Sequence, residues 1–355
     1  MRTNLIVGLV LAGLTGMGCA DKSDPSGTST PASTPQSLAP SVARAPDQDS
    51  LATQAYERVR REFVAGRAAS LRYPVYTLRP VGDTTERARQ RAQELGLDPQ
   101  SLKKTEQGVA VSGERFELRL DAGSGAEMYL DKTRFHAGPG VAALPLQEAE
   151  YIALAQAHVR KRLPEAAAHE LRPYRVRRYM NDMADPRGNR VGATVYQVAV
   201  AFHEVLSGLP VIGAGGKVAV HLTPGGEVVS HEATVRDTAQ HLTEVAGTQL
   251  LAPDDARRQA EEKLTAQGVN LADYTLTRAE LGYYRLGRHG VQSVLAPHYA
   301  YFYEPSSTKV VGKKHLEVIP AVTDPALLER LRQDAREDAT RKADFRSRAA
   351  PPDSK

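Results

Sequence analysis

The chain has 355 residues, of which 41% are hydrophobic and 25% charged, and its formal net charge is +4. This composition excludes collagen-like, wholly disordered and multi-span membrane proteins, and the length allows about two or three domains of common size. The single cysteine excludes an intrachain disulfide and a cysteine-based zinc site, and the interspersed charges with no tryptophan give no indication of nucleic-acid binding.

The first 18 residues have the features of an export signal. An apolar run of ten residues, Leu5–Leu14, is too short to cross a bilayer as a helix, and Gly18 then stands directly before Cys19. This arrangement resembles the lipobox of bacterial lipoproteins, although Gly16 stands where that pattern prefers leucine. The resemblance implies that residues 1–18 are removed and that Cys19 becomes the lipidated first residue. The alternative is a conventional secretory signal that happens to contain a cysteine.

Residues 19–50 are dominated by serine, threonine, proline, alanine and glycine. Because such a segment cannot offset the entropy lost on ordering, it is predicted to be a disordered tether. Together with the acyl anchor, it predicts an extracytoplasmic protein attached to a lipid bilayer. Ala20 follows Cys19, and the lack of aspartate there favours the outer membrane if the host is Gram-negative.

The remainder predicts an α+β fold of tandem small modules, each with one helix packed on a short antiparallel sheet. In the first module, residues 51–140, a strand at 73–78 precedes a helix at 84–95, which Gly96 ends. Three short strands are predicted after it, at 108–111, 115–120 and 126–130.

The second module, residues 141–240, opens with an amphipathic helix at 146–163, which Pro164 interrupts. Its strands are predicted at 174–179, 192–205, 211–222 and 227–235. The third module, residues 241–322, has a helix that begins at Pro253 and strands at 274–286, 294–303 and 310–319. Residues 323–355 predict a charged C-terminal helix and tail.

One stretch of the second module resembles a known superfamily. It contains Tyr196, the step Gly208–Gly213, the alternating strand Val218–Leu222 and the close Gly226–Ser230. This order is similar to the FTP and PepSY modules of the prepeptide that precedes thermolysin-like metallopeptidases, and the third module with its strand Leu295–Tyr303 also looks PepSY-like. The resemblance implies a role in inhibiting or assisting the folding of a peptidase, or a binding module of the cell envelope. No catalytic domain follows these modules in the sequence. This departure from the family pattern argues against a role as an intramolecular prepeptide.

Two groups of residues are predicted to contact a protein partner. In the first group, a strand that starts at a proline beside a Gly-rich loop is expected to leave its backbone groups accessible for pairing; these residues are Gly208, Leu209, Pro210, Val211, Gly213, Gly215 and Gly216. The second is a cationic stripe of Arg175 and Arg177 on one face of a strand, which suits an acidic partner or an anionic lipid surface. The alternatives for the stripe are an exposed strand face without a partner or a protected edge strand.

No catalytic residue, cofactor or metal ligand is predicted, and the protein is expected not to be an enzyme. The dipeptides His203-Glu204 and His231-Glu232 begin like a zinc-peptidase motif, but that motif needs a second histidine four residues after the first, where Ser207 and Val235 stand here. A metal hydrolase that uses His203, His221 and His231 across neighbouring strands stays an alternative, as does an envelope scaffold or sensor.

Overall fold

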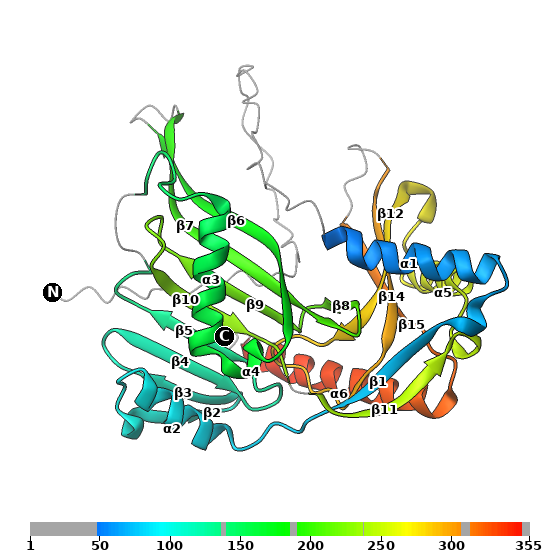
Figure 1. Cartoon of the computed structure of the whole chain (residues 1–355), viewed down its shortest axis with the longest axis horizontal. Coiled ribbons are helices and arrows are strands. Elements are labelled where there is room, and N and C mark those ends of the chain that lie inside the picture. The colour runs from blue at the N-terminus through cyan, green and yellow to red at the C-terminus, as the bar shows by residue number, and fades with distance from the viewer. Residues whose placement is uncertain (1–47, 136–139, 185–189, 237, 307–312, 350–355) are drawn as a thin grey trace, which may run out of the picture. The chain divides into compact units, whose positions relative to one another are not determined.

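The computed structural model describes residues 48–135, 140–184, 190–236, 238–306 and 313–349. The predicted signal peptide, Cys19 and nearly all of the predicted tether lie outside these ranges. Within them, no helix is both long enough and apolar enough to cross a membrane. All described residues belong to one compact unit, whose elements are labelled in Figure 1.

Helices and antiparallel strands alternate along the chain, which confirms an α+β fold. The first elements are α1 (Gln48–Val64), β1 (Arg72–Leu78), α2 (Thr84–Glu94), β2 (Leu102–Thr105), β3 (Gly108–Ser112), β4 (Phe116–Asp121) and β5 (Glu127–Asp131). The middle elements are α3 (Glu148–Arg162), α4 (Pro164–Ala167), β6 (Glu170–Ala184), β7 (Arg190–Leu206), β8 (Leu209–Gly213), β9 (Lys217–Leu222) and β10 (Val228–Ala233). The last are β11 (Thr238–Ala246), α5 (Pro253–Ala266), β12 (Tyr274–Arg285), β13 (Val294–Leu295), β14 (Pro297–Pro305), β15 (His315–Pro320) and α6 (Pro325–Ala349).

Local signals account for where the helices begin. The carboxylate of Asp83 accepts hydrogen bonds from two backbone N–H groups of the first turn of α2. At α3, the carboxylate of Glu150 accepts a hydrogen bond from the backbone N–H of Gln147. Pro253 is the first residue of α5, where its fixed φ suits the helix and its missing N–H is not needed.

Most strands join one long sheet. The order is β15-β14-β12-β8-β7-β9-β10-β5-β4-β3-β2, and β6 pairs with β7. This sheet runs through all three predicted modules, because β10 pairs with β5 and β8 pairs in parallel with β12. Separate tandem modules, each with a sheet of its own, are therefore not what the structure shows.

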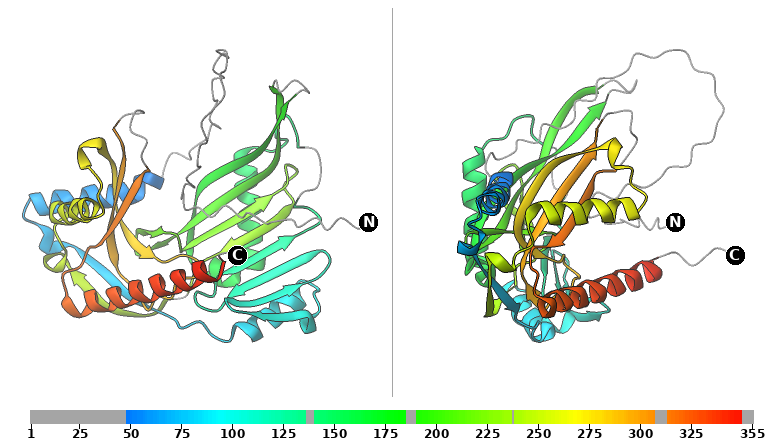
Figure 2. Two further views of the ribbon diagram at one scale, coloured as in Figure 1. Left: turned by 180° about the vertical axis from the view of Figure 1, so that it is seen from behind. Right: turned by 90° about the vertical axis from the view of Figure 1, so that its right-hand side faces the viewer.

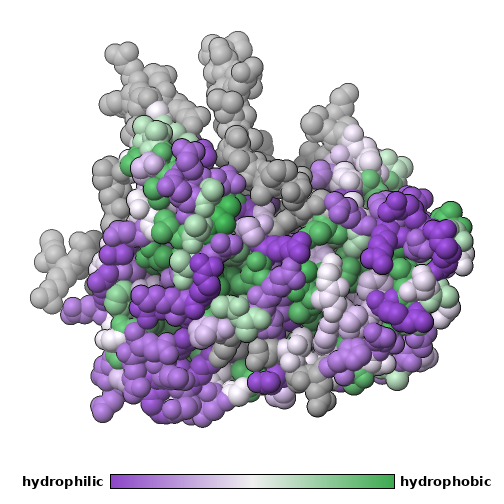
Figure 3. Space-filling view, viewed as in Figure 1, coloured by the Kyte–Doolittle hydropathy of each residue, from purple (hydrophilic) through white to green (hydrophobic). Residues whose placement is uncertain are grey.

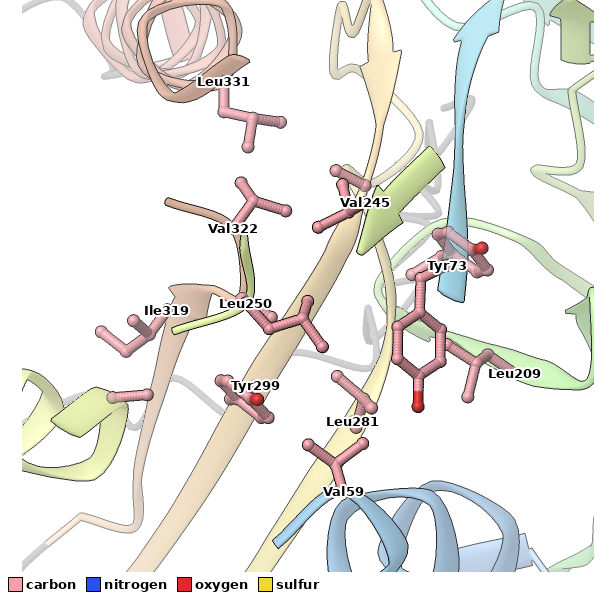
Figure 4. Packing of buried hydrophobic residues seen from close by; sticks show 14 of the residues in the cluster. Val59, Tyr73, Leu209, Val245, Leu250, Leu281, Tyr299, Ile319, Val322 and Leu331 are labelled. Carbon is pink, nitrogen blue, oxygen red and sulfur yellow. The ribbon is translucent and has the colours of Figure 1, made fainter. Parts of the chain in front are cut away.

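The start of the described chain packs with its C-terminal part. β1 pairs with both β11 and β13 in a second, three-stranded sheet. In Figure 4, Val59 of α1 and Tyr73 of β1 point into the same core as Leu281 of β12 and Tyr299 of β14. Residues 51–140, expected to form one module, are thus divided between two cores, because burial of the apolar face of α1 depends on strands that lie far away in the sequence.

The two faces of the long sheet differ around β7 and β9. Val218, Val220 and Leu222 of β9 pack on the core beneath α3, which includes Tyr151 and Ala155. The alternate residues of β9 therefore point to the opposite face. Figures 1 and 2 show none of the described helices over that face at β6, β7 and β9, so we call it the helix-free face.

Candidate partner-binding surface

The Gly-rich segment after β7 is an internal crossover. Leu209 and Pro210 pair with the end of β7, whereas Val211, Ile212 and Gly213 pair in parallel with β12. The four non-glycine residues of β8 are buried, whereas Ala214 in the loop after it is exposed. The backbone of β8 is therefore already paired with β7 and β12. The expectation that this segment offers free backbone groups to a partner strand is wrong.

Close backbone contacts explain the glycines of this crossover. A Cβ atom on Gly215 would stand 2.1 Å from the carbonyl oxygen of Leu286, and one on Gly213 would stand 2.6 Å from that of Arg285. The Gly215 N–H donates to the Arg285 carbonyl at 3.1 Å. A proline followed by several glycines is compatible with an exposed loop or with a tight crossing, and only the neighbouring strand decides between them.

A buried ion pair between Glu204 of β7 and Arg285 of β12 lies beside this Gly-rich segment. The Glu204 side chain has no exposed surface, and its Oε2 lies 3.0 Å from Nη1 of Arg285, whose side chain is also buried. Its Oε1 lies 2.7 Å from Nδ1 of His169, which follows α4. Both carboxylate oxygens thus face cationic or donor groups inside the protein, and Glu204 is not placed to act on a substrate.

The three strand histidines do not converge. His203 stacks on Tyr174 and His221 contacts Gln197, both on the helix-free face. His231 points the other way, where its Nδ1 lies 2.9 Å from Nε2 of His158 on α3. The alternation of β10 separates them, and the described residues hold no group of three side chains that could bind a metal ion. A metal centre built from these histidines is therefore wrong for this geometry.

His231 instead belongs to a buried network beneath α2 and α3. Its Nε2 lies 3.2 Å from Oε1 of Glu127, and Oε2 of Glu127 lies 3.3 Å from both Arg87 and Arg91 of α2. Burial raises the pKa of Glu127, but His231 and the two arginines outweigh it and the net pKa is lowered. This buried network of charged side chains connects residues of the predicted first and second modules. We interpret its role as structural.

The helix-free face carries excess positive charge beside β6. Arg175 pairs with Ala201 and Arg177 with Ala199, so both arginines lie on one face, as the sequence predicts. The Arg177 guanidinium lies 4.9 Å from the ring centre of Tyr179. Burial, and then the charge of Arg175, lower the pKa of Lys217 on β9, while Glu280 partly offsets them.

The outer edge of β6 is the second feature of this surface. β6 is a 15-residue strand that pairs with β7 over its whole length. Among the described residues, no other strand pairs with it. Its sequence prediction, residues 174–179, was too short, because the arginines and Asn181 interrupt the apolar alternation on which strand prediction depends.

A pocket with both apolar and polar residues in its wall borders β6 on the face that α3 covers. Its volume is about 420 Å³, and its lining includes Leu144, Leu146, Arg178, Met180 and Val195. Met180 is 45% exposed, which is unusual for a large apolar side chain in this protein. Figure 3 shows hydrophobic side chains, in green, at the surface over the upper part of α3 and the adjoining strands.

Sequence patterns alone did not identify this pocket. Met180 follows the predicted strand at 174–179, and Leu144 and Leu146 precede the predicted helix. The only local signal is that Arg178 and Met180 are two residues apart and so share a face if the strand is extended. Their meeting with the start of α3 depends on the tertiary structure.

Comparison with known proteins adds little about function. No known family matches the sequence, and no curated protein does. An uncharacterized protein from Eubacterium rectale ATCC 33656 has a similar structure over 71% of this chain and 85% of its own, with 9% identity and a TM-score of 0.40. YycH from Bacillus subtilis matches over 72% of this chain and 52% of its own, with 13% identity and a TM-score of 0.35. This chain thus spans about half the length of YycH, and neither likeness supports an inference about function.

Proposed function

We propose that this protein is a non-enzymatic, lipid-anchored protein of the bacterial cell envelope that binds an extended segment of a partner protein along β6. The observation that carries the proposal is that, among the described residues, β6 pairs with another strand on one side only, next to a pocket that β6 helps to line. Strand addition uses these two features together: the strand edge supplies backbone hydrogen bonds, and pockets for alternate side chains supply selectivity.

The energies of such contacts are sufficient for binding. A net gain of about 1 kcal/mol for each backbone hydrogen bond and about 1.5–3 kcal/mol for one buried apolar side chain are ordinary values. Four or five hydrogen bonds and one filled pocket therefore supply roughly 6–8 kcal/mol before the entropy of association is subtracted. The expected complex is weak to moderate unless further contacts contribute.

The identity of the partner rests on the sequence. The similarity of residues 196–230 to prepeptide modules favours an envelope or secreted peptidase that the protein restrains. An envelope scaffold or sensor is the second candidate and would use the same surface. Cys19, with the export signal before it, supports a location of the proposed complex at a membrane surface outside the cytoplasm, and the residue after it favours the outer membrane in a Gram-negative host.

Substitution of Met180 tests the proposal with a matched control. Leu316 lies on β15, at the far end of the same sheet, and is 48% exposed against 45% for Met180. Because both side chains are exposed on edge strands, Met180→Asp and Leu316→Asp are each expected to change stability by less than about 0.5 kcal/mol. Co-purification from the native envelope after crosslinking is the measurement.

The proposal expects Met180→Asp to reduce recovery of a discrete partner at least tenfold and Leu316→Asp to leave it unchanged. Far-UV circular dichroism of both variants shows whether the fold is intact. Equal recovery by the wild type and Met180→Asp would mean that β6 and its pocket are not the binding surface.

A further inference from the structure

We infer that the segment bound by β6 alternates acidic and large apolar residues. This inference rests on the proposed function and specifies the chemistry of the partner. It follows from the two faces of β6: one carries Arg175 and Arg177, and the other borders a pocket whose wall includes both Met180 and Arg178.

Alternation along a strand sets the pattern. Arg175 and Arg177 project on the helix-free face, whereas Arg178 and Met180 project on the face of the pocket. Side chains of an added strand also alternate between these faces, and those directly opposite β6 residues would lie about 5 Å away between Cβ atoms. Every second residue of the bound segment therefore meets the arginines, and the residues between them meet the pocket.

Within the part of the chain that the structure describes, Arg175 and Arg177 have no carboxylate partner. Neither Arg175 nor Arg177 forms an ion pair with any described residue, in contrast to Arg172 of the same strand, which lies 2.6 Å from Glu170. Lys217 adds a third cation close enough to Arg175 for the two charges to repel. Carboxylates on the bound segment would neutralise this charge and accept hydrogen bonds from the guanidinium groups.

The other face favours a large apolar residue. The pocket of about 420 Å³ has leucine, methionine and valine side chains in its wall, together with Arg178 and Gln147. It lies beside the exposed Met180, so that an apolar side chain entering it would cover both. A small or polar side chain at that position would leave this surface in water.

The same charges disfavour a second copy of this chain as the occupant. β6 carries four arginines and only two acidic residues, Glu170 and Asp182. Antiparallel pairing of two β6 strands about their middle would set Arg177 opposite its own copy, and like charges directly opposite each other are destabilising. A heterologous acidic segment is complementary where a second copy is not.

Peptide binding to the mature protein tests the inference. The probes are fluorescein-labelled nonapeptides in which Glu alternates with Leu, Lys with Leu, or Glu with Ser, and the measurement is fluorescence anisotropy at about 150 mM salt. We expect the Glu/Leu peptide to bind at least tenfold more tightly than the other two. The double variant Arg175→Glu/Arg177→Glu should lose the Glu/Leu peptide and gain the Lys/Leu peptide, whereas Lys103→Glu on the exposed edge strand β2 should change neither.

Retention of the Glu/Leu preference by the charge-reversed variant would overturn the inference, as would equal affinity of the wild type for all three peptides. In either case, loss of the native partner in Met180→Asp would still uphold binding at β6. If the native partner also stays bound to Met180→Asp, both the inference and the proposed function fail.

Discussion

At the scale of single residues, glycine has two different uses within ten positions. Gly208 has a φ of +76° in the turn between β7 and β8, and nothing lies within 4 Å of where its Cβ would stand. Gly215 instead lies against backbone, where any Cβ would meet a carbonyl oxygen of the chain after β12. The first glycine serves the conformation of a turn and the second serves the contact between two parts of the sheet.

Alanine substitution separates these two uses. We expect Gly208→Ala to lower the free energy of unfolding by about 1 kcal/mol, the cost of a left-handed conformation with a side chain. Gly215→Ala forces the two strands apart and is expected to cost at least about 2 kcal/mol, as overpacking does. Urea unfolding measures both, and equal losses would contradict an internal role for the Gly-rich crossover.

His298 predicts an acid-sensitive fold. The side chain is buried, its Nδ1 donates to the carbonyl oxygen of Ala296 at 2.9 Å, and it packs against Tyr284. Burial lowers the pKa of His298 to about 4, with a smaller lowering from Lys263 and an opposing contribution from the hydrogen bond. Because the folded pKa lies below the unfolded value of about 6.5, the unfolded state binds more protons between these values, and stability falls as the pH drops from 6.5 towards 4.

The variant His298→Gln isolates this contribution from other titrating groups. Between pH 7 and pH 4.5 the wild type should lose about 2 kcal/mol more of its unfolding free energy than the variant, at about 1.4 kcal/mol per unit of pKa difference. His203 and His221, whose pKa values burial lowers to about 4, remain in both proteins and cancel in the difference. Identical pH dependence of the two proteins in urea unfolding would refute this interpretation of His298.

At the scale of elements, α6 matches its predicted range but has an unexpected role. The sequence predicts a charged, weakly amphipathic helix, and Leu327 and Leu331 of this helix are buried in the core. The carboxylate of Asp334, also buried, accepts hydrogen bonds from the backbone N–H groups of Ser293 and Val294 at 2.9 and 3.2 Å. α6 therefore holds the short strand β13 that pairs with β1.

Two acidic residues of α6 provide a matched comparison. Asp334→Ala leaves those buried N–H groups without an acceptor and is expected to lower the unfolding free energy by about 2–3 kcal/mol. Glu329 forms only exposed ion pairs with Arg332 and Arg336, so Glu329→Ala should cost less than about 0.5 kcal/mol. Thermal unfolding of the two variants measures this difference. A similar decrease in Tm for both would disprove that Asp334 stabilises the fold by holding β13.

At the scale of the whole molecule, sequence patterns predicted what local interactions determine. The hairpins β3–β4–β5, the helices α2 and α5 and the alternation of β9 follow from turn residues, helix caps and hydrophobic periodicity within short windows. The pairing of β1 with β11 and β13, the parallel contact of β8 with β12 and the burial of α1 do not, because each joins residues distant in the sequence. The candidate site divides in the same way: the arginine stripe was predicted, and the pocket beside Met180 was not.

Binding of a partner along β6 is the central claim, and site-specific photocrosslinking tests it most directly. A photoreactive side chain in place of Asn181, which is exposed on β6, is compared in living cells with one in place of Leu316 on β15. We predict a discrete adduct from position 181 that Met180→Asp abolishes, and no such adduct from position 316. Equal adduct yields from the two positions, or none from position 181, would contradict the claim that β6 binds a partner.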